Sequence, residues 1–363
     1  MTTSPVDLLF IGGKPTWKSP ATISFNRLPA RASALPFADV KSARTLSREQ
    51  TPYFQSLNGT WDFTLLHRPE DVRNEMLQPG FGLTGFRTIP VPSNWTMQDT
   101  FDKPHYTNVQ MPFTQEPPEV PAENPTGVYR TSFTVPKNWN GRRVVLHIGG
   151  AESVLYVWVN GKAVGLSKDT RLPSEFDVTE FLQPGQNLLS AVVVKWSDAT
   201  FIEDQDQWWM GGIYREVYLY STPQVWLDDI FSRGSLDDSF RHGVLTVYAR
   251  MGFLPTQPPE GDWHMELQIY DGVKPLFKKP IRETIDLRIA AESRHQARFH
   301  VPKLTTIKPW SAESPKLYTV VVTLLKDRKI VDATACRTGF RRRCTRPTPM
   351  KMNRNTVTWV RWR

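Results

Sequence analysis

The sequence predicts an all-β, loop-rich protein. Thirty prolines are spread over 363 residues, and proline in a helix interior removes a hydrogen bond and clashes with the preceding turn. Short segments with strand-like alternation recur along the chain, whereas helical periodicity longer than a turn or two is hard to find. The length favours two or three domains, each large enough to bury an ordinary core.

The clearest strands lie in residues 51–222, which we expect to form a jelly-roll sandwich. Val154–Val159 and Lys162–Leu166 flank Asn160-Gly161, the strongest two-residue hairpin signal. Ile89–Trp95 is expected at a sheet edge, because its prolines cannot donate to a ladder. The other expected strands are Val128–Val135, Arg143–Ile148, Phe176–Val178, Leu188–Trp196, Ile213–Tyr220 and the end of Ser56–Phe63.

A second sandwich, of immunoglobulin-like size, is expected over residues 223–340. Its alternating segments are Val244–Arg250, Met265–Tyr270, His295–Val301, Leu317–Leu325 and Val331–Thr338. Such a domain holds about seven strands. Two flanking regions lack this pattern. We expect residues 1–50 to be an extended N-terminal arm and residues 341–363 to be an unstructured, basic C-terminal tail.

The net charge of +9 is confined to the C-terminal end. Residues 337–363 hold eight Arg and one Lys without any acid, so the remaining 336 residues carry 36 basic and 36 acidic groups. A neutral body argues against nucleic acid as a partner. Two cysteines do not form a disulfide framework. We expect no membrane partner, since no apolar stretch approaches a spanning length, and a cytoplasmic location, since no signal peptide is evident.

Several segments carry a resemblance to a known family. They are Asn26-Arg27-Leu28, Ser56–Phe63, Val91–Trp95, Tyr106–Val109, Glu123–Gly127, Arg171–Tyr220 (the densest), Pro309–Glu313 and Pro315–Tyr318. In order and spacing these segments resemble the large bacterial and fungal β-galactosidases of glycoside hydrolase family 2, over roughly residues 20–341. The resemblance implies a sugar-binding, galactose-binding-like jelly roll, an immunoglobulin-like domain, and hydrolysis of terminal non-reducing β-D-galactose from lactose-type substrates.

In that family both catalytic glutamates lie on a (β/α)₈ barrel that follows the second sandwich. Here the resemblance ends near Arg341, and the remaining residues read RRCTRPTPMKMNRNTVTWVRWR. We interpret this tail as an unrelated reading frame or a mis-spliced exon. The chain is then a fragment truncated before the barrel, with no catalytic residue of its own, and whether it acts as an enzyme stays open. A retaining mechanism needs both carboxylates, so we expect the fragment alone to be inactive.

The resemblance assigns two substrate-binding residues, Asn108 and Asp206. Asp206 matches a residue that holds a sugar hydroxyl and helps to coordinate sodium in the full enzyme, and Asn108 matches a second residue of the same galactose site. An acidic loop such as Glu203–Asp206 is otherwise commonly a solvated turn, and an Asn before a strand is commonly a turn residue. Trp208 and Trp209 could stack on a sugar face, although a buried core role suits at least one of them.

Three functions remain in competition. The first is a β-galactosidase fragment whose partners are a β-galactoside and a missing catalytic barrel; full-length members of the family form homo-oligomers and use magnesium and sodium, but the residues here demonstrate no cofactor. The second is a stand-alone carbohydrate-binding protein without catalysis. The third is a basic interaction protein driven by the Arg-rich tail, which the neutral body disfavours.

Overall fold

The computed structural model describes residues 8–32, 34–108, 110–169, 171–203, 206–254, 258–285, 287 and 295–342. The chain divides into two compact units. Unit 1 comprises residues 1–36 and 51–224, and unit 2 comprises residues 37–50 and 225–363. Strands dominate the described part of both units, where α1 (Val40–Ala43) is the single α-helix. The all-β prediction is therefore confirmed.

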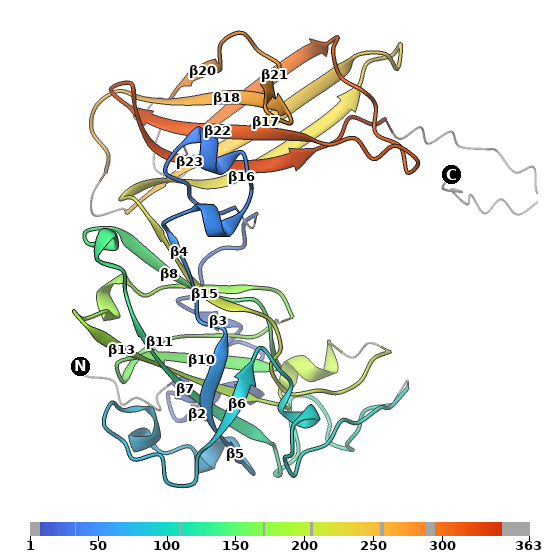
Figure 1. The fold of residues 1–363 in the computed structure, drawn as a ribbon. Coiled ribbons are helices and arrows are strands. Elements are labelled where there is room, and N and C mark those ends of the chain that lie inside the picture. The colour runs from blue at the N-terminus through green and yellow to red at the C-terminus, as the bar shows by residue number, and fades with distance from the viewer. Residues whose placement is uncertain are drawn as a thin grey trace, which may run out of the picture. The chain divides into compact units, whose positions relative to one another are not determined.

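Unit 1 is a sandwich of two antiparallel sheets (Figure 1). The larger sheet has the order β3 (Ser24–Phe25), β11 (Lys162–Ser167), β10 (Val154–Val159), β13 (Gln186–Val194), β7 (Thr126–Thr134), β5 (Gly59–Leu66), β6 (Arg87–Val91). The smaller sheet has the order β12 (Ser174–Asp177), β8 (Arg143–Ile148), β15 (Val217–Thr222), β4 (Phe54–Ser56). Two short ladders join β1 (Phe10–Ile11) to β2 (Lys14–Pro15) and β9 (Ala151–Glu152) to β14 (Gly212–Ile213). The 3₁₀ turns of unit 1 are η2 (Thr16–Lys18), η4 (Pro69–Asp71), η5 (Asn74–Leu77), η6 (Trp95–Met97), η7 (Lys137–Trp139), η8 (Thr179–Phe181) and η9 (Asp198–Phe201).

The centre of the larger sheet is buried on both faces. Every residue of β10 is buried, and its sequence VLYVWV has apolar or aromatic side chains on both sides of the pleat. Leu155 and Val157 belong to the core between the two sheets. Tyr156 and Trp158 belong to a second cluster on the opposite face, which therefore requires a cover of its own.

Part of that cover comes from the N-terminal segment. Leu9 and Trp17 are at most 1% exposed and pack in the second cluster with Tyr156. The hydroxyl oxygens of Thr16 and Tyr156 lie 2.8 Å apart. The expected arm over residues 1–50 is thus divided: residues 8–36 belong to unit 1, and residues 37–50, with α1 and η3 (Arg48–Gln50), belong to unit 2. Apolar residues without alternation can still pack as a sheet cover.

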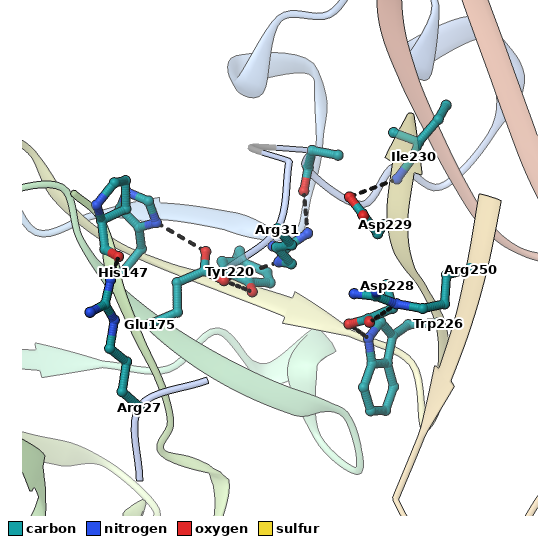
Figure 2. Close-up of polar contacts among 12 residues, drawn as sticks. Arg27, Arg31, His147, Glu175, Tyr220, Trp226, Asp228, Asp229, Ile230 and Arg250 are labelled. Atoms are coloured by element: carbon teal, nitrogen blue, oxygen red, sulfur yellow. Dashed lines mark hydrogen bonds and ion pairs between the residues drawn. The ribbon is translucent and has the colours of Figure 1, made fainter. Parts of the chain in front are cut away.

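A buried polar network ties the same segment to the smaller sheet. Figure 2 shows the Glu175 carboxylate between His147, Arg31 and Tyr220. Arg31 Nε lies 3.0 Å from Glu175 Oε2, His147 Nδ1 lies 3.0 Å from Oε1, and the Tyr220 hydroxyl donates to Oε2 at 3.1 Å. Burial alone would raise the pKa of Glu175, but the hydrogen bond from His147 and the charges of Arg31 and His147 outweigh it and lower this pKa to about 2.

This lowered pKa predicts acid sensitivity. A carboxyl that ionises more readily in the folded state stabilises that state above its ordinary pKa, and the contribution is lost as the pH falls from about 4.5 to about 2. Urea unfolding of the parent and of Glu175→Gln should therefore differ clearly at pH 7 and converge toward pH 2. A difference that did not change with pH would show that Glu175 acts only through packing.

The segment expected as one strand, Ile213–Tyr220, is two strands in different ladders. β14 pairs with β9, whereas β15 pairs with β8 and β4. Between them the backbone N–H groups of Tyr214 and Arg215 both donate to the carbonyl of Gly150. This turn moves the chain from one ladder to the next, and a continuous apolar run does not reveal such a change.

Unit 2 contains a second pair of antiparallel sheets (Figure 1). One has the order β16 (Val225–Leu236), β17 (Gly243–Phe253), β21 (Gln296–Leu304). The other has the order β19 (Lys274–Pro275), β18 (Trp263–Asp271), β22 (Tyr318–Lys326), β23 (Lys329–Thr338), with β20 (Ile281–Thr284) also paired to β18. The alternating segments that the sequence singled out in this region correspond to β17, β18, β21, β22 and β23.

β16 is the longest of the described strands that sequence patterning missed. It spans 12 residues, and its register shifts between Leu227 and Asp229 where it pairs with β17. The adjacent acids Asp228 and Asp229 and the glycine at 234 interrupt the alternation that marks a half-buried strand. Asp228 is held in place because its Oδ2 accepts from Arg250 Nε at 2.6 Å (Figure 2).

Two further expectations concern the C-terminal tail and a membrane-spanning segment. The tail predicted over residues 341–363 lies outside the described residues from position 343 onward. Within the described ranges, no helix has the length and apolar character needed to cross a membrane.

Candidate functional site

Two loops of unit 1 that carry Asn108 and Asp206 pair with one another. The first, residues 102–108, follows η6, and the second, here called the Asp206 loop (residues 202, 203 and 206–210), follows η9. His105 and Trp209 form an isolated antiparallel bridge. Trp209 N lies 2.7 Å from His105 O, and His105 N lies 3.3 Å from Trp209 O. The fold therefore brings together two segments that are widely separated in the sequence.

Side chains reinforce this pairing on the exposed side. The Tyr106 hydroxyl donates to Asp206 Oδ1 at 2.6 Å, and this hydrogen bond raises the pKa of Tyr106. The rings of Tyr106 and Trp208 lie 5.5 Å apart and are 49% and 55% exposed. Asp206 and Asn108 are also exposed. A carboxylate and two aromatic rings thus lie together, and the exposed Asn108 is on the same segment as Tyr106. Such a set suits a ligand with both hydroxyl groups and apolar C–H faces.

Trp209 has a different role from its neighbour. Its side chain is 3% exposed and belongs to the cluster that covers the larger sheet, where its ring lies 5.5 Å from that of Trp196. Its indole N–H donates to Thr107 Oγ1 at 2.7 Å. Trp209 therefore anchors the Asp206 loop in the core, while Trp208 faces outward.

A buried ion pair supports the 102–108 segment from below. Lys195, directly after β13, places its Nζ 2.7 Å from Asp102 Oδ1 and 2.9 Å from Oδ2. The side chains are 0% and 4% exposed. The Trp95 indole N–H donates to Asp102 Oδ2 at 2.7 Å, so the carboxylate has both a counter-ion and a neutral donor. Burial lowers the pKa of Lys195, and Asp102 opposes this effect.

A second buried ion pair holds the start of η9. Lys168 Nζ lies 2.5 Å from Asp198 Oδ1 and donates to the backbone carbonyl of Ser19 at 2.9 Å. Ser197 and Thr200 form a capping box around the same turn. Asp198 is therefore committed to internal contacts and serves as a structural comparison for Asp206.

Glu203, inside the Asp206 loop, is an acid in a crowded environment. Its side chain is 13% exposed and its Oε2 lies 4.0 Å from Arg171 Nε. Its Oε1 has no hydrogen-bond partner within the described part of the chain. Burial raises the pKa of Glu203 to about 7; Arg171 opposes the rise, while Asp169, Glu152 and Asp198 add to it.

This raised pKa predicts an effect opposite to that of Glu175. An acid that holds its proton more tightly in the folded state makes that state less stable as the pH rises from about 4.5 to about 7. Glu203→Gln should therefore raise the thermal midpoint at pH 8 and leave it nearly unchanged at pH 4.5. The exposed Glu75, replaced by Gln, is the control for the loss of a surface carboxylate. Equal effects of the two substitutions at pH 8 would contradict the assignment.

Asp206 could supply one oxygen ligand to a cation, as the resemblance implies for sodium. No group of three or more His, Cys, Asp or Glu side chains is arranged to hold a metal ion within the residues that the structure describes. One carboxylate is an incomplete ligand set for a hard cation, which takes several oxygen atoms. A sodium or magnesium site here would therefore need further ligands.

Comparison with known proteins agrees with this architecture. The family model "Glycosyl hydrolases family 2, sugar binding domain" matches residues 54–223, and the model "Glycosyl hydrolases family 2" matches residues 225–341. The chain belongs to glycosyl hydrolase family 2. The first matched region lies within unit 1, and the second lies within unit 2. Within this family-2 chain, both paired loops fall in the sugar-binding domain.

Curated relatives carry the name beta-galactosidase. The protein from Psychromonas ingrahamii is 40% identical over 302 residues, which is 82% of this chain and 28% of the relative. The protein from Priestia megaterium is 37% identical over 337 residues, which is 91% of this chain and 32% of the relative. The family-2 chain thus spans about a third of the length of the curated relatives that it matches.

Solved structures share the fold at low sequence identity. Bacteroides uniformis beta-glucuronidase 2 aligns with a TM-score of 0.61 and 20% identity, covering 81% of this chain and 33% of that one. Bifidobacterium dentium beta-glucuronidase aligns with a TM-score of 0.61 and 20% identity, covering 82% and 50%. These likenesses support the family-2 sandwich fold alone.

Sequence reasoning singled out Asn108, Asp206 and the two tryptophans but missed the residues that hold them. Tyr106 lies two positions before Asn108 in a segment noted for its resemblance, and Arg171 opens the densest such segment. Their contacts cross long stretches of chain, so neither spacing nor composition could pair them with the Asp206 loop.

Proposed function

We propose that this chain supplies one wall of the galactose site of a family 2 β-galactosidase, with Asn108 and Asp206 as residues that contact the sugar. The chemistry would be hydrolysis of terminal β-D-galactose from lactose-type substrates, completed by a catalytic barrel. The observation that carries the proposal is the pairing of the 102–108 segment with the Asp206 loop. Asn108 and Asp206 are both exposed, and the loops that carry them adjoin at the His105–Trp209 bridge, which supports a shared role.

The character of that surface gives further support. Large apolar side chains rarely gather on an exposed surface without a partner. Here several that are at least 48% exposed lie on η6, in the stretch between η6 and the 102–108 segment, on the paired loops or beside Arg171: Met97, Phe101, Tyr106, Leu172, Ile202 and Trp208. A neighbouring domain or a sugar that covered these side chains would remove them from water. The named relatives extend well beyond the region matched here, so they have further chain that could form such a domain.

Catalysis itself is assigned to residues outside the two sandwiches. Retaining glycosidases use two carboxylates about 5–5.5 Å apart, one as acid/base and one as nucleophile. Two of the acids near the candidate site form buried ion pairs: Asp198 with Lys168, and Asp102 with Lys195. The Glu203 side chain is only 13% exposed and lies beside Arg171. Asp206, hydrogen-bonded to Tyr106 and exposed, is suited to holding a hydroxyl group.

The test is to compare this chain with a barrel fusion, in which the part of the Psychromonas relative that follows its matched region is joined after Arg341 to supply the barrel that the family resemblance implies. We expect the chain alone to give no turnover of a chromogenic β-galactoside above an empty-vector control. We expect the fusion to hydrolyse it and to be inhibited by galactose. Hydrolysis by the chain alone, abolished by a substitution within it, would overturn this division of roles.

The alternative of a stand-alone carbohydrate-binding protein is favoured by one observation, the exposed Tyr106 and Trp208 rings beside a carboxylate. It predicts that the chain alone binds galactosides on a glycan array without turnover, and that Trp208→Ala removes the binding. An inactive but folded fusion together with array binding would favour this alternative.

A further inference from the structure

One guanidinium group joins three segments around the Asp206 loop. Arg171 lies between β11 and β12. Its Nη2 donates to Glu152 Oε1, on β9, at 3.2 Å, and its Nε lies 4.0 Å from Glu203 Oε2, in the loop. The backbone carbonyl of Arg171 accepts from Arg215 Nη1 at 3.0 Å, which holds the Arg171 backbone in place. The Arg171 side chain is 18% exposed.

The same guanidinium contacts the residue that follows Asp206. We assign the Gln207 amide with its oxygen toward Arg171, because the opposite orientation would place N–H groups against N–H groups. In this orientation the oxygen accepts from Arg171 Nη2 at 2.7 Å and also from Nη1. Arg171 thus holds Glu203 and Gln207, three positions before and one position after Asp206. The planar, multi-donor guanidinium can make these contacts together, whereas a lysine ammonium cannot reproduce their geometry.

Among the described residues, this part of the loop is also contacted by Tyr106, whose hydroxyl donates to Asp206 Oδ1, and its start is held by backbone hydrogen bonds to the carbonyl of Ala199. The loop leaves η9 and returns to the sheet at Trp209, whose backbone pairs with His105. Between these points Ile202 is 86% exposed and Trp208 is 55% exposed, so core packing does not fix this part of the loop. We propose that Arg171 is a positioning residue that fixes the backbone on both sides of Asp206 and thereby aims its carboxylate at the sugar. The link to sugar rests on the proposed function, whereas the positioning itself does not.

The decisive experiment is amide hydrogen exchange of the unliganded chain, which reports local opening separately from global unfolding. In Arg171→Gln, peptides covering residues 201–209 should exchange at least about tenfold faster, while strands β7, β10 and β13 keep the exchange of the parent. Arg171→Lys should fall between the two. Gln207→Leu, which removes only the amide contact, should also speed exchange in the loop and should leave the thermal midpoint nearly unchanged.

Arg143→Gln is the matched control. Arg143 forms a similarly buried ion pair, with its Nε 2.6 Å from Asp177 Oδ2 and its side chain 7% exposed, but it does so between β8 and β12. Its loss should leave exchange in residues 201–209 unchanged. The proposal is overturned if loop exchange in Arg171→Lys and Gln207→Leu equals that of the parent. It is also overturned if Arg171→Gln speeds exchange equally throughout unit 1, because that would be a purely structural role.

A sugar-binding readout separates this inference from the proposed function. In the barrel fusion, Arg171→Lys should weaken inhibition by galactose by roughly three- to tenfold, the range of a weakened charge-assisted contact. Suppose that loop exchange is faster in Arg171→Lys, but inhibition by galactose is unchanged in both Arg171→Lys and Asp206→Asn. The role of Arg171 in positioning the loop would then stand, and the proposal that this loop contacts sugar would be wrong.

Discussion

Asp102→Ala should lower the free energy of unfolding of unit 1 by about 3–5 kcal/mol, the range found when one partner of a buried ion pair is removed. The Lys195 ammonium is fully buried, and Asp102 meets it with both carboxylate oxygens. Removing the acid leaves that ammonium without its direct counter-ion and leaves the Trp95 indole N–H without its acceptor. Urea unfolding, followed by tryptophan fluorescence, measures this change.

Two further variants make the result interpretable. Asp71→Ala removes a solvent-exposed pair with Arg68 and should change the free energy of unfolding far less, because water screens such pairs. The double replacement Asp102→Leu with Lys195→Met should recover much of the loss, because apolar residues can replace a buried pair without leaving a charge behind. A loss below about 1 kcal/mol for Asp102→Ala would mean that the pair is hydrated or dispensable.

The second large effect is expected on catalysis. In the barrel fusion, Asp206→Asn should lower kcat/KM for a β-galactoside by one to two decades, since a charge-assisted hydrogen bond is worth roughly 1.5–3 kcal/mol. Asn108→Ala should cost about 1 kcal/mol, because a neutral amide contributes less. The sodium dependence of the reaction should also weaken in Asp206→Asn if its carboxylate is a cation ligand.

Asp198→Asn is the matched control for that experiment. Asp198 lies eight positions before Asp206, is 10% exposed, and pairs with Lys168. Its replacement should lower the thermal midpoint and leave the affinity for galactose close to that of the parent. If Asp206→Asn and Asp198→Asn changed kcat/KM equally, Asp206 would have no special place at the sugar.

The sequence was most informative about strands whose burial alternates or whose turn is explicit. The hairpin around Asn160-Gly161 joins β10 and β11, and five alternating segments correspond to strands of unit 2. The sequence was least informative about residues whose place in the fold does not follow from the local pattern of polar and apolar residues. The acids of β16 interrupt its alternation, so this 12-residue strand was not predicted. The N-terminal apolar residues lack a period because they pack as a cover on a sheet.

The candidate site was likewise predictable only in part from the sequence. The resemblance supplied Asn108 and Asp206, and the exposure of Trp208 and burial of Trp209 fit the expectation that at least one of the two lies in the core. The supports of the site could not be read from the sequence. Tyr106 and Asp206 are 100 positions apart, and Lys195 and Asp102 are 93 apart. Such pairs depend on how η6, β13 and the loops meet in the folded sandwich, which no local period encodes.

The proposal that this chain forms one wall of the galactose site is tested most directly by a crystal structure of the barrel fusion soaked with galactose. We expect a sugar hydroxyl within hydrogen-bonding distance of an Asp206 carboxylate oxygen, about 2.5–3.2 Å, with the Asn108 amide reaching the same sugar. Galactose bound in the barrel with neither side chain in contact would contradict the assignment of this surface.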